Sequence, residues 1–445
     1  MEVDQYQPRR VEMLIAEAAT IQAIVVVLQT VPIGTNLGLA HVMWAMANGS
    51  FLSSRGGIFP ALQLCGMSAE EIRQSWSALR KGSWEVAELI SSLETYAKTE
   101  AGWRENRYEG YRAMSVDTTG FWRPRLKGWL VKHFSSIAGK ALPAVVFGII
   151  VISGQIGGKR VPLLKAIVRW KPEESKSEFH IKLLKQAGKQ RQFNDICIVD
   201  AGLEVSEIHE AKLSNYVARL AKNCTARRNK LPKYKGKGAR PKYGEYVRPL
   251  ARMGRNDNLI PATEAEHTCT FEFEERTITV SYWHDLVLST TKVSDDAITF
   301  SIYLYHDPDY QEPLILATDI KPKMAQTPYL LYNDRWTAEH PPLAAKHMIG
   351  LHRHFVFATE SCFRLPELAF IVGSILTLVS ASNPPIPSGF WDRKPQPTPG
   401  RLRNALRNAD FPSFSQFDPH IRKKNSVSQH LPKGIHAHRR HKLAA

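Results

Sequence analysis

The stretch Tyr332-Asn-Asp-Arg335-Trp-Thr-Ala-Glu339-His-Pro-Pro-Leu-Ala-Ala-Lys346 surrounds one carboxylate with a phenol and two cations. A helix turning by roughly 100° per residue would place four of its polar side chains on one face: Tyr332, Arg335, Glu339 and Lys346. On such a face Glu339 is suited to hold a metal ion, and Arg335 and Lys346 are suited to bind a phosphodiester. An ordinary solvated face of mixed charge is the alternative.

A pair of prolines follows the carboxylate within this stretch. Pro341-Pro342 is expected to kink or end a helix after Glu339, because proline lacks a backbone N–H and clashes with the preceding turn. The spacing therefore predicts that Tyr332 and Arg335 share the face of Glu339, and it leaves the position of Lys346 open.

Two segments upstream are predicted to be strands that each deliver a further acid. Residues 111–116 end at Asp117, and the apolar run 195–199 ends at Asp200. An acid at the end of a strand suits metal binding at a sheet edge, although Asp is also common in turns and helix caps. The elements expected in chain order are strands 111–116, 141–152 and 159–168, helix 173–186, strand 195–199, helix 205–212 and strand 216–220.

The spacing Y-x2-R-x3-E-x6-K, with Asp117 and Asp200 upstream, resembles the motif of bacterial insertion-sequence transposases of the DDE class. The subgroup that it resembles has an RNase H-like core and a β-rich insertion between the second Asp and the Glu. The resemblance implies that Asp117, Asp200 and Glu339 are catalytic and hold two Mg²⁺ (or Mn²⁺) ions. Glu360 and Glu367 are rival third acids, but neither has the accompanying Tyr, Arg and Lys.

The implied fold is α/β (α+β, multidomain), with an RNase H-like mixed sheet, flanking helices, a β-rich insertion and an N-terminal all-helical domain. In the helical domain, residues 59–65 and the helix after the capping box Ser68-x-x-Glu71 form a helix-turn-helix candidate, a pattern that plain helical packing also produces. Insertion strands are expected at 269–273, 277–282, 286–289 and 298–305, and a last core strand at 313–320. The expected domains are 1–105 (helical, DNA-binding), 106–222 (first part of the catalytic core), 223–312 (basic loop and β-rich insertion), 313–382 (second part of the core with the Glu helix) and 383–445 (disordered basic tail).

The chain is strongly basic, with a formal net charge of +17, and its most basic part opens the insertion. Between Arg219 and Arg255 there are thirteen Lys or Arg residues against one acid, with tyrosines interleaved. Because cations neutralise phosphates and rings stack on bases, this pattern favours a nucleic-acid partner over a solvated loop. Trp283 is a candidate for stacking on a base, with a place in the core as the alternative. The predicted DNA contacts are Arg227, Arg228, Lys230, Lys233, Lys235, Lys237, Arg240, Trp283, Tyr332, Arg335 and Lys346.

The resemblance implies double-stranded DNA as the partner, namely the terminal inverted repeats of an element and its target, bound by a homodimer without a membrane. Five scattered cysteines and the lack of a basic leader indicate a reduced, cytoplasmic, nucleoid-associated protein. Polar residues interrupt the apolar segment 13–31, so a buried helix is expected there. The predicted function is metal-dependent cleavage and strand transfer in cut-and-paste transposition. The alternatives are an RNase H-like DNA nuclease and an inactive DNA-binding derivative of a transposase.

Overall fold

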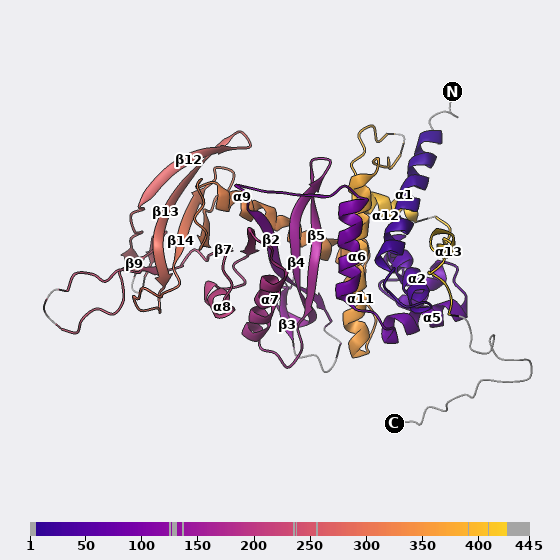
Figure 1. The fold of residues 1–445 in the computed structure, drawn as a ribbon, viewed down its shortest axis with the longest axis horizontal. Helices are drawn as coiled ribbons and strands as arrows, with labels where there is room; N and C mark the ends of the chain where they lie inside the picture. The colour runs from indigo at the N-terminus through magenta and orange to yellow at the C-terminus, as the bar shows by residue number, and fades with distance from the viewer. Residues whose placement is uncertain are drawn as a thin grey trace, which may run out of the picture.

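The computed structural model is a mixed α/β chain, in which N-terminal helices, a central sheet and a β-rich extension follow one another along the long axis (Figure 1). It describes residues 6–123, 126, 131–135, 138–234, 236, 238–254, 257–389, 391–407 and 409–424. Helices precede the first long strand, as predicted for the N-terminal region.

The N-terminal region is helical as far as Thr99. The capping box at Ser68 and Glu71 opens α5, as predicted, and α2 packs closely against α5. A Cβ at Gly38 in α2 would lie 2.6 Å from the Cβ of Ala78, so glycine permits this approach. DNA contact by the predicted helix-turn-helix, formed by α4 and α5, stays a prediction. The helices are α1 (Tyr6–Val27), α2 (Thr35–Ala47), α3 (Ser50–Ser53), α4 (Ile58–Leu64), α5 (Ala69–Lys81) and α6 (Val86–Thr99).

Five strands of the central sheet run in the order β5-β4-β2-β6-β7. β4 is antiparallel to both β2 and β5, whereas β2, β6 and β7 are mutually parallel. Helix α7 (Lys176–Gln190) connects β5 to β6, and α8 (Val205–Glu210) connects β6 to β7. The strands are β2 (Arg112–Trp122), β4 (Lys140–Ile156), β5 (Lys159–Arg169), β6 (Asp195–Val199) and β7 (Tyr216–Arg219), with the short β1 (Arg104–Glu105) and β3 (Lys132–Ser135) on β4.

The sheet continues beyond β7 through β15, the strand predicted to be the last of the core, and then through the strands of the predicted insertion. β15 pairs with β7 and β14, and β14 pairs with β13, which also pairs with β12 and β8. The predicted strands 277–282 and 286–289 form one strand, β13, with a register irregularity between Trp283 and Leu286. The strands are β8 (Ala226–Arg228), β9 (Tyr246–Val247), β12 (His267–Phe273), β13 (Arg276–Leu288), β14 (Phe300–His306) and β15 (Leu314–Thr318), with β10 (Arg252–Met253) and β11 (Leu259–Ile260) as a separate pair.

Helix α11 (Thr359–Ser382) lies between the sheet and the N-terminal helices (Figure 1). It packs on β5 and β4 on one side and on α1, α2, α5 and α6 on the other. In the described part of the chain it is the one helix long and apolar enough to cross a bilayer, but 89% of its apolar window is buried inside the fold. Such burial on all sides is typical of a core helix.

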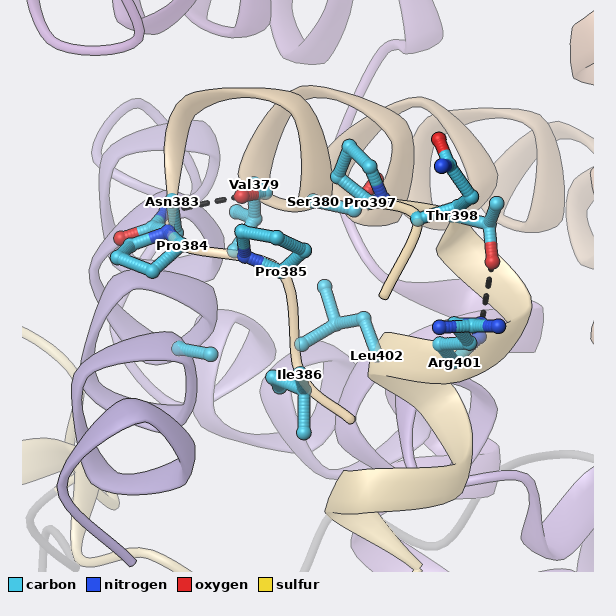
Figure 2. A pocket seen from close by; sticks show the side chains of 12 residues that line it. Val379, Ser380, Asn383, Pro384, Pro385, Ile386, Pro397, Thr398, Arg401 and Leu402 are labelled. Carbon is cyan, nitrogen blue, oxygen red and sulfur yellow. Dashed lines mark hydrogen bonds between the residues drawn. The ribbon is translucent and has the colours of Figure 1, made fainter. Parts of the chain in front are cut away.

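The chain after α11 corrects the prediction of a disordered tail at 383–445. Residues up to 424 include α12 (Pro399–Leu406) and α13 (Phe414–Phe417), and α12 packs on α11 and α1. Figure 2 shows Leu402 of α12 and Ile386 beneath the end of α11, where Asn383 donates a hydrogen bond to the Val379 carbonyl. The prediction of disorder rested on the basic, proline-rich composition. The segment also contains apolar side chains at helical spacing, Leu402 and Leu406, which are buried. Residues 425–445 lie outside the described part.

Candidate active site

Strand register brings the two predicted aspartates together. β2 and β6 are parallel, and Val116 pairs with Val199. Asp117 follows Val116 and Asp200 follows Val199, so the two aspartates occupy neighbouring positions. The prediction that Asp117 ends its strand is wrong, because β2 continues to Trp122 and Asp117 pairs with Ile149 of β4. Asp200 directly follows β6, as predicted. The neighbouring positions therefore follow from the sheet, and no loop conformation is needed to explain them.

The guanidinium of Arg335 gathers all three predicted acids. Its Nη1 lies 3.9 Å from Asp117 Oδ2 and 3.6 Å from Asp200 Oδ2. Its Nη2 lies 3.2 Å from Glu339 Oε1 and donates a hydrogen bond to it. The Arg335 side chain is only 8% exposed, whereas the side chains of Asp117, Asp200 and Glu339 are 28%, 34% and 42% exposed, so water reaches the carboxylates more readily than the cation.

The segment that carries Arg335 and Glu339 is helical but irregular. It passes from α9 (Thr327–Asn333) into the 3-10 helix η2 (Asp334–Glu339), then α10 (His340–Leu343) and the π-helical turn η3 (Ala344–Met348). A helix boundary falls after Glu339, as expected, because η2 ends there and α10 begins at His340. The chain nevertheless stays helical, because both prolines stand in the first turn of α10, where helical N–H groups need no partner.

Lys346 consequently returns to the strand of the first acid. Its Nζ donates a hydrogen bond of 2.6 Å to Thr119 Oγ1, two residues beyond Asp117 on β2. The rings of Phe121 and Trp122 lie 5.4 and 5.0 Å from the ammonium. Burial lowers the pKa of Lys346 to about 8, against the opposing effect of Asp117.

Two further side chains contact Asp200. The Tyr332 hydroxyl donates a hydrogen bond of 3.0 Å to Asp200 Oδ1, and Arg219 Nη1 lies 3.6 Å from the same oxygen. The predicted phosphate contact of Tyr332 stays a prediction. Sequence reasoning missed Arg219, although it ends β7, whose pairing of Ala218 with Val199 places Arg219 beside Asp200.

The two aspartates differ electrostatically. Burial raises the pKa of Asp117 to about 6, and the charges of Asp200 and Glu339 add to this shift. Burial also acts to raise the pKa of Asp200, but Arg335 and hydrogen bonds from Ala201 and Tyr332 outweigh it, so the pKa lies below its ordinary value. A cluster in which one acid readily holds a proton beside a second that stays ionised is typical of functional sites.

A buried acid anchors the helical segment to the sheet. Asp334, which is fully buried, lies 3.3 Å from Arg160 Nε and accepts a hydrogen bond of 3.4 Å from Asn106. Burial raises the pKa of Asp334, and these partners oppose the shift. Asp334 thus positions Arg335, its neighbour in η2.

A cavity lies beside the acids, lined by Arg219, Tyr310, Tyr332, Arg335 and Trp336 among others. Trp336 is 59% exposed, and the Arg335 guanidinium lies 5.8 Å from its ring. Of the two interpretations of Trp283, the structure supports a place in the core over stacking on a base. Trp283 is 1% exposed, and its indole N–H donates to the Glu264 carbonyl. The exposed aromatics among the described residues that line this cavity are Trp336 and the 64% exposed Tyr310, and sequence reasoning passed over both.

The predicted basic contacts divide into two groups. Arg227 donates to the Ser289 and Gly244 carbonyls and stacks 3.7 Å from the centre of the Tyr246 ring, and Arg228 pairs with Glu266. These two arginines hold the loop between β8 and β9 to the sheet. That loop extends from the end of the molecule opposite the N-terminal helices (Figure 1). The exposed members on it are Lys230, Lys233 and Arg240, whereas Lys235 and Lys237 lie outside the described residues.

The rival acids belong to a different cluster. Glu360 and Glu367 both pair with Arg169, at 3.0 and 2.6 Å, and Glu360 also pairs with Arg364. Among the acids that the structure describes, Glu339 therefore is the one that joins Asp117 and Asp200 around a common cation.

The donor set fits hard divalent ions, because carboxylate oxygens are the ligands that Mg²⁺ and Mn²⁺ prefer. As placed, the acids surround a guanidinium, and no group of three or more His, Cys, Asp or Glu in the described residues stands at metal-binding spacing. A metal would take the place of the Arg335 charge. A comparison with protein-family models and with curated proteins finds no match for this chain.

Proposed function

We propose that this chain is a DNA transposase of the DDE class with an RNase H-like core. The observation that carries the proposal is the convergence of Asp117, Asp200 and Glu339 on the Arg335 guanidinium. The strand order β5-β4-β2-β6-β7, with antiparallel pairs first and parallel pairs after, supports an RNase H-like core with acids on its first and fourth strands. The extension from β8 to β14 corresponds to the β-rich insertion of the subgroup.

The proposed reaction is cleavage of a phosphodiester by water, followed by attack of the freed 3′-OH on the target strand. Asp117, Asp200 and Glu339 would hold two Mg²⁺ or Mn²⁺ ions, which supply activation of the attacking oxygen and stabilisation of the leaving oxygen. Lys346 and Arg219 lie at the acids, as charges that grip the phosphates of the strand. Tyr332 orients Asp200 through its hydroxyl.

The proposed substrate is double-stranded DNA, bound as inverted-repeat ends by a homodimer in the bacterial cytoplasm. The loop between β8 and β9 carries exposed cations suited to the phosphate backbone. The overall charge of +17 also favours a polyanionic partner. The cavity beside the acids, with Arg219 and Trp336 on its wall, would admit the strand to be cut.

Cleavage and joining of the element's own ends tests this proposal. Inverted repeats in the DNA that flanks the reading frame supply the substrate. Asp117→Asn, Asp200→Asn and Glu339→Gln are each expected to abolish cleavage while DNA binding persists, since each removes a metal-bound charge and keeps the shape. Glu360→Gln is the matched control and should cut normally. Normal cleavage by Glu339→Gln would overturn the assignment of the third acid.

An inactive DNA-binding derivative is the second candidate, and one observation favours it. Arg335 already neutralises part of the acid cluster, since it contacts all three carboxylates. Such a protein would bind the ends and neither cut nor join them. An RNase H-like nuclease would instead cut but fail to join a pre-cleaved end to target DNA, so the joining assay separates all three functions.

A further inference from the structure

We infer that Arg335 is an internal counter-ion that competes with divalent metal for the three carboxylates, so that metal binds only as Arg335 leaves. The inference rests on the proposed function and concerns the loading of the same site. It goes beyond a role for Arg335 on DNA alone, because it gives the residue a role before DNA arrives.

The contacts of Arg335 are electrostatic and loosely bonded. Among the described residues it donates one hydrogen bond, to Glu339, and its other two carboxylate contacts are 3.6 and 3.9 Å long. Its Nε is buried without a hydrogen-bond partner. The guanidinium carbon lies 5.5 Å from the centre of the Tyr332 ring and 5.8 Å from that of the Trp336 ring, within cation–π range. Arg335 is thus held mainly by charge and cation–π contact, with its hydrogen-bonding capacity mostly unused.

A structural arginine elsewhere in the same sheet differs clearly. Arg112 forms a two-pronged pair with Asp195, at 2.7 and 2.8 Å, and donates a further bond of 3.0 Å to Gln192. Such a fork satisfies the donors of a buried arginine and makes it costly to move. Arg335 lacks this fork, which is the arrangement expected of a cation that can be released.

The acids explain why a replacement cation is needed. Without Arg335 three carboxylates would stand together with no cation among them, and such like-charge crowding is unfavourable. Two divalent ions neutralise the cluster more fully than one guanidinium. The cavity that Arg335 lines gives it a place to turn toward an incoming phosphate. Phosphate and metal would then each favour the binding of the other, since both favour the released position of Arg335.

Metal titration without DNA tests this inference, with Mn²⁺ as the probe and its affinity measured by electron paramagnetic resonance. Arg335→Gln is expected to bind Mn²⁺ more tightly than wild type, by roughly 5- to 150-fold, the range usual for two coupled ligands. Arg407→Gln is the control, because it removes the same charge from an exposed position just beyond α12, away from the acids. Equal or weaker Mn²⁺ binding by Arg335→Gln would overturn the inference.

A second measurement guards against misfolding and separates the two proposals. Mn²⁺ should raise the Tm of Arg335→Gln more than that of wild type, and Arg335→Lys, which keeps the charge, should lie between them. Adding Asp117→Asn, Asp200→Asn and Glu339→Gln to Arg335→Gln should abolish Mn²⁺ binding. Persistent binding would place the metal elsewhere and count against the proposed function. Binding that is abolished there, but not tightened in Arg335→Gln, would overturn the counter-ion role alone.

Discussion

At the scale of single residues, the environment rather than the residue type separates the two aspartates. Asp117 and Asp200 occupy neighbouring positions on parallel strands. Burial raises the pKa of Asp117 to about 6. Burial also acts to raise the pKa of Asp200, but Arg335 and the hydrogen bonds from Ala201 and Tyr332 together hold that pKa below its ordinary value. Folding therefore favours the protonated form of Asp117 and the charged form of Asp200.

Asp117→Asn, which resembles the protonated acid, is expected to make the metal-free protein more stable than wild type at about pH 8. The stability contributed by protonated Asp117 is complete below the ordinary pKa and is lost as the pH rises through about 6. The difference between variant and wild type should thus shrink toward about pH 5, as measured by thermal unfolding in EDTA.

Asp200→Asn is the control of opposite sign. The contribution of charged Asp200 is present above the ordinary pKa and is lost as the pH falls, so this variant should be less stable at about pH 8. Shifts of the same sign in both would contradict this reasoning.

The two tryptophans of interest should separate DNA binding from stability. Trp336 is 59% exposed beside the acids, so Trp336→Ala is expected to weaken binding of cleaved-end DNA by about 1–3 kcal/mol, the usual value of one base–ring stack, with an unchanged Tm. Trp283 is buried, so Trp283→Ala should instead destabilise the fold by about 3–5 kcal/mol. Gel-shift and urea unfolding measure the two effects. Unchanged DNA binding by Trp336→Ala would mean that the Trp336 ring does not contact DNA.

At the scale of elements, the local sequence pattern predicted the strands better than it predicted which strands pair and which side chains they bring together. The buried strand 195–199 and the capping box at Ser68 are found with the predicted bounds and bonds. The neighbouring positions of Asp117 and Asp200 depend on the pairing of segments far apart in sequence, which one strand does not encode. Trp283 occupies the core, one of the two positions that the strand pattern left open. It belongs to the main core, while Val280 of the same strand belongs to a second cluster, so both faces of β13 are covered.

The helical segment around Glu339 shows why even spacing was insufficient. The expectation of one face assumed a uniform α-helix, whereas the chain changes from α to 3-10 and later to π geometry. Tyr332 and Arg335, which the spacing placed on the face of Glu339, and Lys346, whose position it left open, all lie near the acids, but each makes a different contact. Arg335 reaches all three carboxylates, and Lys346 reaches the strand of Asp117 through Thr119. The sequence pattern identified the residues of the site, and the pairing of the strands determines which of them are in contact.

The loop between β8 and β9 is expected to dominate the salt dependence of DNA binding. Changing its exposed Lys230, Lys233, Arg240 and Lys242 to Ala should flatten the log–log salt slope by roughly 0.9 for each phosphate that is no longer neutralised. Fluorescence anisotropy with duplex DNA over a range of salt measures the slope. The control removes the same charge from Lys171, Lys176, Lys185 and Lys189, exposed residues in and just before α7. An equal change in both variants would show that only net charge matters. Arg227→Ala should lower stability as well, because Arg227 holds two backbone carbonyls.

At the scale of the whole molecule, α11 connects the helical region to the sheet. Arg169 of β5 binds Glu367 and Glu360 of α11, and Arg364 of α11 donates to the carbonyls of Leu79 and Gly82 in the helical region. The C-terminal segment completes this connection. Arg403 of α12 donates to the Met348 carbonyl at the end of η3, the turn that carries Lys346. The segment predicted to be a tail thus contacts the turn that carries Lys346.

Point changes in α12 test that support. Leu402 and Leu406 are 2% and 0% exposed, and both join the main core. Each change to Ala is expected to lower the free energy of unfolding by about 2–5 kcal/mol, the cost of a cavity at a buried leucine. Urea unfolding measures this, and Arg407→Ala, at an exposed position just beyond α12, is the control and should change stability by less than about 0.5 kcal/mol. If α12 also positions η3, then Arg403→Ala should reduce cleavage more than Arg407→Ala at equal stability. Wild-type stability in Leu406→Ala would mean that this segment does not pack on α11 in solution, and the prediction of a disordered tail would return.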